Sequence, residues 1–181
     1  MKKVVFFDRD GTLIYDKIYL NDPNQIQYLP GVFEGLRLLR DQGFEFIIVT
    51  NQSGVPRGLV DVDNLKVIHQ TIRADFSRAG IDVLGFYYAP FMVNSNHPMR
   101  KPNAGMLEAG IKDHNVDRQV SWMVGDRMTD VEAGHRASIK SVFLAGTENP
   151  DDSEFDEAEY YANTFLELSQ HICSQDSQFN S

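Results

Sequence analysis

Two aspartates stand two residues apart directly after a short apolar run, a spacing that could support metal binding and nucleophilic chemistry. Asp8 and Asp10 follow the run Val4-Val5-Phe6-Phe7. Such a run is typical of a buried strand in a parallel sheet, and side chains two residues apart at its carboxyl end point to the same side. Because neighbouring carboxylates repel each other, the pair calls for a cation or a shared proton. The pair therefore predicts a metal site that also offers a nucleophile and an acid/base.

A turn and a calcium loop are the two alternatives for this aspartate pair. Taken alone, Asp8 and Asp10 are as compatible with a solvated turn as with a site, since Asp and Gly favour turns. A calcium loop of the EF-hand type requires Gly at its sixth position and Glu at its twelfth. Counted from Asp8, these positions hold Leu13 and Tyr19, which excludes that kind of calcium site.

The composition of the chain indicates a folded domain and argues against one class of partner. With 181 residues, of which 42% are hydrophobic, the chain is long enough for one domain with a substantial core. Its net charge of −9 leaves no basic surface that would attract the phosphate backbone of a nucleic acid. An acidic protein still binds a phosphate ester where positive charge gathers in one pocket. We therefore expect a small-molecule partner and no nucleic acid.

Cysteine content and hydropathy suggest a compartment. The single cysteine, Cys173, excludes a disulfide framework and a cysteine-based zinc site within one chain. The apolar run after Met1-Lys2-Lys3 is too short for a signal peptide, and no stretch approaches the roughly 18 apolar residues of a membrane span. We expect a soluble, monomeric protein of the reducing cytoplasm, without a membrane partner.

Strand-like and helix-like segments alternate along the chain. We expect strands at residues 4–7, 45–49, 83–89, 120–124 and 141–144, with a short edge strand at 160–163. We expect helices at residues 31–42, 61–79, 129–137 and 164–173, and another that Asn103 caps at its start. The alternation predicts one α/β domain over residues 1–173, with a doubly wound, mainly parallel, Rossmann-like sheet. Residues 147–159 are expected to form a mobile acidic loop and residues 174–181 a disordered tail.

Each expected core strand is followed by residues that could bind phosphate or carry out catalysis. These segments are Asp8 with Asp10, then Thr50-Asn51-Gln52-Ser53-Gly54, then Arg100-Lys101-Pro102 before a helix, and Gly125-Asp126-Arg127 with Asp130. Singly, they are compatible with turns, a solvated lysine and helix caps. The carboxyl ends of parallel strands meet at one edge of a sheet. Four such segments in order therefore predict one shared pocket.

The order of these motifs resembles the haloacid dehalogenase (HAD) superfamily of phosphotransferases. The resemblance covers residues 4–146 and rests on Asp-x-Asp-Gly-Thr at 8–12, a strand ending in Thr50, Lys101-Pro102 and Gly-Asp-x-x-x-Asp at 125–130. Three segments, residues 7–12, 50–54 and 100–102, are similar to the narrower group of heptose 1,7-bisphosphate phosphatases and histidinol-phosphate phosphatases. The stretches 19–31 and 55–58 favour the heptose branch. The resemblance implies a HAD-like fold, here without a large cap domain because the spacings after Asp10 and Thr50 are short.

The resemblance implies separate roles for the aspartates. Asp8 would attack phosphorus and form an aspartyl phosphate. Asp10 would protonate the leaving sugar oxygen and then deprotonate the attacking water. Mg²⁺ would be held by Asp8, the backbone carbonyl of Asp10 and Asp126, and Asp130 would orient these ligands without binding the ion.

The same resemblance implies how the pocket would hold its substrate. Thr50 and Lys101 would bind oxygens of the transferred phosphate, since phosphoryl transfer depends on positioning and charge stabilisation. Arg57, Arg100 and Arg127 are candidates for gripping a second phosphate in a bidentate manner. The remaining candidate substrate-binding residues are Asn51, Gln52 and Ser53, together with the loop from Asp16 to Tyr19. The alternative for these residues is an ordinary surface loop.

One stretch departs from the pattern of the narrower group, which carries a zinc loop of Cys and His before Arg-Lys-Pro. Residues 89–99 contain no cysteine and a single histidine, His97. Because tetrahedral zinc needs more ligands than that, we expect no structural zinc and interpret His97 as a surface loop residue.

These observations lead to one leading hypothesis and two alternatives. The leading hypothesis is a Mg²⁺-dependent phosphatase acting on a phosphorylated sugar similar to heptose 1,7-bisphosphate. A histidinol-phosphate phosphatase or another small-metabolite phosphomonoesterase is the alternative among enzymes. A phosphoryl-accepting signalling or binding module is the alternative outside enzymes, although an acid/base at Asp10 argues against a long-lived phosphoryl group.

Overall fold

The computed structural model describes residues 1–179, which contain a six-stranded sheet whose neighbouring strands all run parallel. The strands are β1 (Val4–Phe7), β2 (Glu45–Asn51), β3 (Val83–Ala89), β4 (Trp122–Gly125), β5 (Lys140–Leu144) and β6 (Tyr160–Ala162). Their order is β3-β2-β1-β4-β5-β6, so the winding reverses between β1 and β4. Ligands of open α/β sheets bind outside the carboxyl ends of the strands at such a reversal. This architecture confirms the predicted doubly wound parallel fold.

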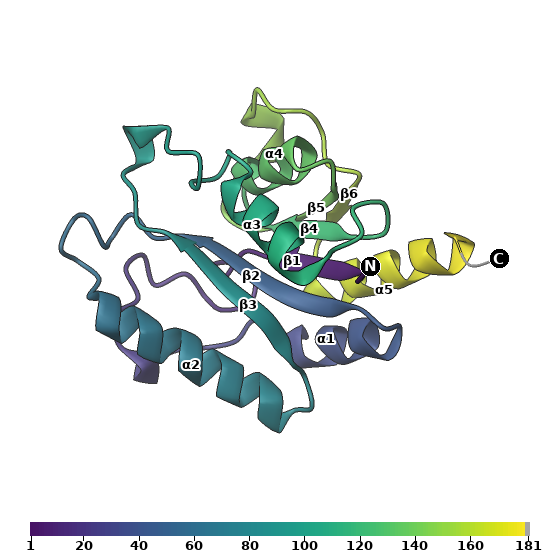
Figure 1. Cartoon of the computed structure of the whole chain (residues 1–181), viewed down its shortest axis with the longest axis horizontal. Helices are drawn as coiled ribbons and strands as arrows, with labels where there is room; N and C mark the ends of the chain where they lie inside the picture. The colour runs from purple at the N-terminus through teal and green to yellow at the C-terminus, as the bar shows by residue number, and fades with distance from the viewer. Residues whose placement is uncertain (180–181) are drawn as a thin grey trace.

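Helices cover both faces of the sheet (Figure 1). One face carries α1 (Val32–Asp41), α2 (Val62–Arg78) and α5 (Phe165–Phe179), and the other carries α3 (Gly105–His114) and α4 (Met128–Arg136). Short 3-10 helices lie at Pro23–Gln25, Val93–Ser95 and Pro150–Asp152. A parallel sheet requires this double cover, because its crossover helices lie on both faces.

The central strand β1 shows how the core is divided. Val5 and Phe7 pack into the cluster formed with α1, α2 and α5, whereas Val4 and Phe6 pack into the cluster formed with α3. All four side chains are buried. Since successive side chains of a strand point to opposite faces, an uninterrupted apolar run fits a strand that is covered on both sides.

The second strand extends further than its apolar run suggests. We expected it to end at Val49, whereas β2 continues to Asn51 because Thr50 and Asn51 still pair with Tyr88 and Ala89 of β3. This extension holds the backbone of two predicted site residues in a regular strand.

Two expectations about helix ends were wrong. Helix α3 begins at Gly105, and its N-cap is Ala104 rather than Asn103. The Asn103 side chain instead donates to the carbonyl of His97 at 3.1 Å and accepts from Arg136 at 2.7 Å, so it ties the preceding loop to α4. These tertiary contacts occupy the hydrogen-bonding groups of the Asn103 side chain, so it does not cap the helix.

Helix α5 continues through residues 174–179, where a disordered tail was expected. Asp176 is buried and accepts a hydrogen bond from Lys3 Nζ at 2.7 Å, which fastens this part of the helix to the start of β1. Residues 180–181, the end of the expected tail, lie outside the described residues.

The connections on the site edge of the sheet are short. Between β1 and α1 the described chain has one 3-10 turn and isolated bridges, and between β2 and α2 it has turns only. These connections leave no room for a large cap domain. None of the helices within residues 1–179 combines the length and apolar character needed to cross a bilayer.

Candidate active site

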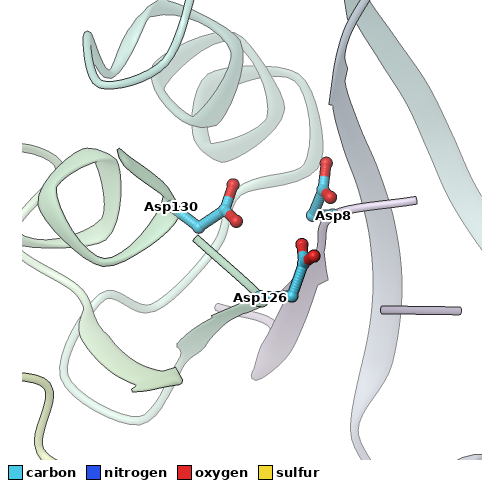
Figure 2. Close-up of side chains that lie close together, drawn as sticks. All are labelled: Asp8, Asp126 and Asp130. Carbon is cyan, nitrogen blue, oxygen red and sulfur yellow. The ribbon is translucent and has the colours of Figure 1, made fainter. Parts of the chain in front are cut away.

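Three carboxylates face one another at the point where the sheet reverses (Figure 2). Asp8 follows β1, Asp126 follows β4, and Asp130 lies in the first turn of α4. One oxygen from each lies within 4.8 Å of the others, and all three residues are buried. The Asp8 amide donates to the carbonyl of Val124 at 2.9 Å, so the end of β1 is fixed to β4. The strand ends therefore bring together residues that are far apart in sequence.

The geometry of this cluster fits a hard cation. Asp126 Oδ1 is buried and has no hydrogen-bond partner among the described residues, which is costly for a carboxylate unless an ion or water completes it. Gly11, at φ +80°, lies against the same group, and a Cβ there would come within 2.1 Å of Asp126 Oδ2. Clustered carboxylate oxygens are the ligands that Mg²⁺ uses in proteins. Among the described residues, Asp8, Asp126 and Asp130 form the one group of three metal-capable side chains.

Lys101 supplies the positive charge inside the cluster. Its ammonium donates to Asp8 Oδ1 at 2.7 Å and to the carbonyl of Val49 at 2.9 Å, and it lies 2.7 Å from Asp130 Oδ1. These contacts use all three of its N–H donors. Burial alone would lower the pKa of Lys101, but the carboxylates of Asp130 and Asp8 outweigh it and raise that pKa. The lysine is therefore charged and fixed.

The charges in the cluster do not balance. Burial raises the pKa of Asp8 well above its usual range, and Asp130 and Asp126 add to this effect while Lys101 opposes it. Burial and then the charge of Asp130 raise the pKa of Asp126 to about 7. Three carboxylates around one ammonium leave two negative charges in excess, which bound protons or a divalent cation would offset.

Asp10 lies beside this cluster and has a different set of partners. Arg9 Nη2 donates to both of its carboxylate oxygens, at 3.0 and 2.9 Å, and Gln52 Nε2 donates to Oδ2 at 3.1 Å. Arg9 was not among the residues expected at the site. Its position in the sequence between Asp8 and Asp10 was the one feature that could have indicated a role for Arg9 at the site.

Two residues at the end of β2 support their neighbours. Asn51 donates to the carbonyl of Lys101 and accepts from its amide, each at 3.0 Å, which fixes the backbone that carries the lysine. Thr50 is buried, and its hydroxyl accepts from Gln52 at 2.9 Å.

The site opens into a cavity of about 470 Å³. Eleven of the residues expected at the site line it: Asp8, Asp10, Asp16, Tyr19, Asn51, Gln52, Ser53, Arg100, Lys101, Arg127 and Asp130. Three expected residues, Thr50, Arg57 and Asp126, are not part of its lining. Six further residues line it: Ile18, Gly54 and Pro102 belong to segments predicted for the pocket, whereas Val93, Thr129 and Glu148 were not expected. Glu148 comes from the acidic stretch after β5 and accepts from the amide of Met128 at 3.0 Å.

Of the three expected arginines, Arg100 and Arg127 line this cavity, and Arg57 lies near Arg100. Arg100 is partly buried, and burial followed by the charge of Arg57 lowers its pKa. Within residues 1–179, neither Arg57 nor Arg100 forms an ion pair with a carboxylate. Arg127, by contrast, lies 3.7 Å from Asp16. Two neighbouring guanidiniums without an acidic partner form a favourable place for an anion.

The loop before Arg100 is held by aromatic stacking. The rings of Phe91 and His97 stack with centroids 3.5 Å apart and planes at 13°. His97 Nδ1 accepts from the amide of Met99 at 3.1 Å, and Arg100 Nη1 donates to the carbonyl of Phe91 at 3.0 Å. His97 belongs to no cluster of three metal-capable side chains in the described part of the chain.

The chain is similar to proteins whose names indicate one reaction. Residues 98–168 match a family model described as HAD-hydrolase-like. The chain is 37% identical to the D-glycero-β-D-manno-heptose-1,7-bisphosphate 7-phosphatase of Pasteurella multocida, over 83% of this chain and 85% of that relative. It is 33% identical to the D-glycero-α-D-manno-heptose-1,7-bisphosphate 7-phosphatase of Photorhabdus laumondii, over 94% and 96% of the two chains.

The fold has a similar counterpart among solved structures. The crystal structure of the D,D-heptose 1,7-bisphosphate phosphatase from B. bronchiseptica, complexed with magnesium and phosphate, matches with a TM-score of 0.86. The two chains are 23% identical, and the match covers 96% of this chain and 99% of the other. At this identity the match concerns the fold.

Proposed function

Since this chain belongs to the haloacid dehalogenase-like phosphatases, we propose that it removes the phosphate from the primary hydroxyl of a sugar bisphosphate similar to D-glycero-D-manno-heptose 1,7-bisphosphate. The observation that carries the phosphatase assignment is the buried group of Asp8, Asp126, Asp130 and Lys101 at the sheet reversal. The names of the relatives, which are more than 30% identical over most of both chains, support the substrate. The cytoplasmic location and the monomeric state inferred from the sequence remain part of the proposal.

The proposed reaction has two steps in which Asp8 and Asp10 act in turn. In the first step, an Asp8 oxygen attacks phosphorus, the bond from phosphorus to the sugar oxygen breaks, and Asp10 gives that oxygen a proton. In the second step, water attacks the aspartyl phosphate, Asp10 takes a proton from the water, and phosphate leaves. Asp8 is then free again and Asp10 is protonated, so the cycle is balanced.

The remaining residues of the group would stabilise charge and position the reacting groups. Lys101 and Thr50 would bind oxygens of the transferred phosphate, and Lys101 also offsets the charge of Asp8 as the anion approaches. Asp8, the Asp10 carbonyl and Asp126 would hold Mg²⁺, while Asp130 would orient Lys101 and the ligands. When bound, the ion supplies positive charge to the phosphate and to the carboxylates.

The arginines suggest why a bisphosphate would be preferred. Arg57 and Arg100 lie close enough for the charge of Arg57 to lower the pKa of Arg100, after the larger effect of burial. Because neither guanidinium has a carboxylate partner among the residues that the structure describes, a second phosphate dianion would relieve their repulsion and gain bidentate hydrogen bonds. Arg127 would join them once it is released from Asp16.

A direct assay tests the proposal. Purified protein with Mg²⁺ is given the α and β anomers of D-glycero-D-manno-heptose 1,7-bisphosphate, and in parallel histidinol phosphate. We expect release of one phosphate per bisphosphate, a higher kcat/KM than for histidinol phosphate, and complete loss of turnover in Asp8→Asn. If histidinol phosphate were preferred, the substrate assignment would be wrong. If no ester released phosphate, or if Asp8→Asn remained active, the phosphatase mechanism would be rejected.

A further inference from the structure

Arg9 is a buried charged residue with no role in the reaction proposed above. It lies between Asp8 and Asp10, and its side chain is 1% exposed. A guanidinium cannot shed its proton, so burying it is costly unless every part of it is paired. The partners of Arg9 therefore indicate what the buried charge does.

One partner of Arg9 is the proposed acid/base. Nε and Nη2 donate to Asp10 Oδ1 at 3.1 and 3.0 Å, and Nη2 also donates to Oδ2 at 2.9 Å. Gln52 Nε2 approaches Oδ2 at 3.1 Å from another element. Contacts to both oxygens fix the plane of the carboxyl group, which a single hydrogen bond would not do. The Asp10 side chain lines the cavity while its orientation is set from inside the protein.

The other partner of Arg9 is His69 on α2. Arg9 Nη1 lies 3.1 Å from His69 Nε2. Because arginine has no acceptor, Nε2 must accept this hydrogen bond, and the proton of a neutral imidazole then lies on Nδ1. Burial, and next the charge of Arg9, lower the pKa of His69 to about 3, so the ring is neutral. The imidazole stacks on Phe86 of β3 with centroids 4.9 Å apart.

We propose that Arg9 and His69 are positioning residues for the acid/base of the phosphatase: His69 fixes the Arg9 guanidinium, and Arg9 sets the orientation of the Asp10 carboxyl group. The inference rests on the proposed function, because it assigns a purpose to the geometry of Asp10. Displacing a reacting group by about 1 Å costs on the order of 10²-fold in rate. A rigid support behind Asp10 would prevent that loss.

The choice of leaving group separates positioning from general damage. A sugar hydroxyl leaves phosphorus only with help from an acid, whereas the far more acidic p-nitrophenol leaves with little help. The value of kcat/KM reports the first step, in which this difference arises. We expect Arg9→Met to lower kcat/KM for the heptose bisphosphate on the order of 10²-fold, and for p-nitrophenyl phosphate by a much smaller factor. The quantity to be measured is kcat/KM for the heptose bisphosphate divided by kcat/KM for p-nitrophenyl phosphate, with Mg²⁺ present throughout.

A pair of His69 variants keeps the test decisive if Arg9→Met folds poorly, and a double-variant cycle extends the test if Arg9→Met folds well. His69→Phe removes the acceptor while Arg9 stays, and His69→Gln keeps an acceptor. We expect this ratio to fall in His69→Phe and to stay near the wild-type value in His69→Gln. In a double-variant cycle, Arg9→Met should add nothing to Asp10→Asn, because the two changes remove the same function.

The outcomes are distinct. Equal losses for both esters in all variants, or additive losses of Arg9→Met and Asp10→Asn, would overturn the positioning role while wild-type activity remained. A wild-type protein inactive on both esters would instead reject the proposed function itself.

Discussion

The ammonium of Lys101 lies 2.7 Å from Asp8 Oδ1 and 2.7 Å from Asp130 Oδ1, and so joins the strand end of β1 to the first turn of α4. It is the cation that balances part of the charge in the carboxylate cluster. A mobile phosphate-binding lysine would have free donors, whereas this one has all of them occupied before substrate arrives. Lys101 therefore organises the site as well as stabilising an incoming anion.

We predict that Lys101→Met lowers both activity and stability. Loss of one charge-stabilising group in a phosphoryl-transfer site should reduce kcat on the order of 10²- to 10³-fold. Breaking a buried ion pair costs about 3–5 kcal/mol, which corresponds to a decrease of roughly 10 °C in Tm without Mg²⁺. Phosphate release and thermal unfolding are the measurements. Lys66→Met, at an exposed pair 3.5 Å from Asp63, is the control and should change neither. Unchanged stability in Lys101→Met would show that the buried pairs are not held together by this ammonium.

Gly11 gives a second prediction, which concerns metal affinity. A Cβ at Gly11 would come within 2.1 Å of Asp126 Oδ2, so Gly11→Ala must displace that carboxylate. We expect the Mg²⁺ concentration at half-maximal activity to rise by about 10-fold or more. The same shift should be seen in the Mg²⁺ dependence of Tm, which does not depend on turnover.

The control for Gly11→Ala separates metal binding from backbone strain. Gly43 has a similar φ of +84°, and a Cβ there would meet only the flexible end of Lys3, at 3.4 Å. Gly43→Ala should therefore carry the cost of a left-handed alanine, about 1–2 kcal/mol, with no change in the Mg²⁺ dependence. Equal Mg²⁺ dependence in the two variants would mean that Asp126 does not bind the ion.

The parts of the site that could be predicted are those that a short stretch of consecutive residues determines. An apolar run followed by Asp8 and Asp10 marks a strand and its end, and parallel topology then brings Lys101 and Asp126 to the same edge. The pairing of Arg9 with His69 could not be predicted in this way, because the two residues are 60 positions apart and meet only when α2 packs on the sheet.

The length of α5 depended on tertiary structure in the same way. The polar sequence after Cys173 gives no reason for helix, but Asp176 meets Lys3 at 2.7 Å once the chain has folded. Asn103 has the residue type of a cap, yet its contacts with His97 and Arg136 determine its place.

A third prediction concerns the pH dependence of stability. The pKa of His69 is about 3 in the folded protein and 6.5 in its unperturbed state, so below pH 6.5 the unfolded chain binds a proton that the folded chain does not. The stability due to neutral His69 is thus complete above pH 6.5 and falls as the pH decreases toward 3. The loss is at most about 1.4 kcal/mol per pH unit.

The matched variant for this prediction is His69→Gln, which keeps an acceptor for Arg9 and cannot titrate. Denaturant unfolding at several pH values between 6.5 and 4 should show the wild type losing free energy of unfolding more steeply than the variant. Any constant offset between the two is the cost of the substitution itself. Parallel curves would contradict a buried neutral imidazole at this position.

A fourth prediction concerns zinc. The loop of residues 89–99 is held by the stack of Phe91 on His97 and by backbone hydrogen bonds rather than by a set of metal ligands. Protein purified with Mg²⁺ should therefore contain far less than one zinc per chain in elemental analysis. A zinc-selective chelator should leave Tm unchanged. Stoichiometric zinc that is lost in His97→Ala would show that this loop binds metal after all.

The last prediction concerns recognition of the second phosphate. Arg100 has no carboxylate partner in the described part of the chain, and the Phe91 carbonyl orients it at 3.0 Å, so its guanidinium is available for an anion near Arg57. A charge-assisted hydrogen bond contributes about 1.5–3 kcal/mol. Arg100→Gln should therefore raise KM for the heptose bisphosphate by about 10-fold or more.

Comparison with a substrate that lacks the second phosphate gives this prediction its control. KM for a sugar monophosphate should remain within about twofold in Arg100→Gln, since only one phosphate then needs binding. His97→Ala should raise the bisphosphate KM by a smaller factor, because a lost aromatic stack, about 0.5–1.5 kcal/mol, loosens the Phe91 carbonyl that orients Arg100. Arg118→Gln, which breaks a surface pair with Glu108 at 2.7 Å, should affect neither substrate. Equal increases of KM for monophosphate and bisphosphate would place Arg100 at the reacting phosphate and leave the preference for a bisphosphate to Arg57 and Arg127.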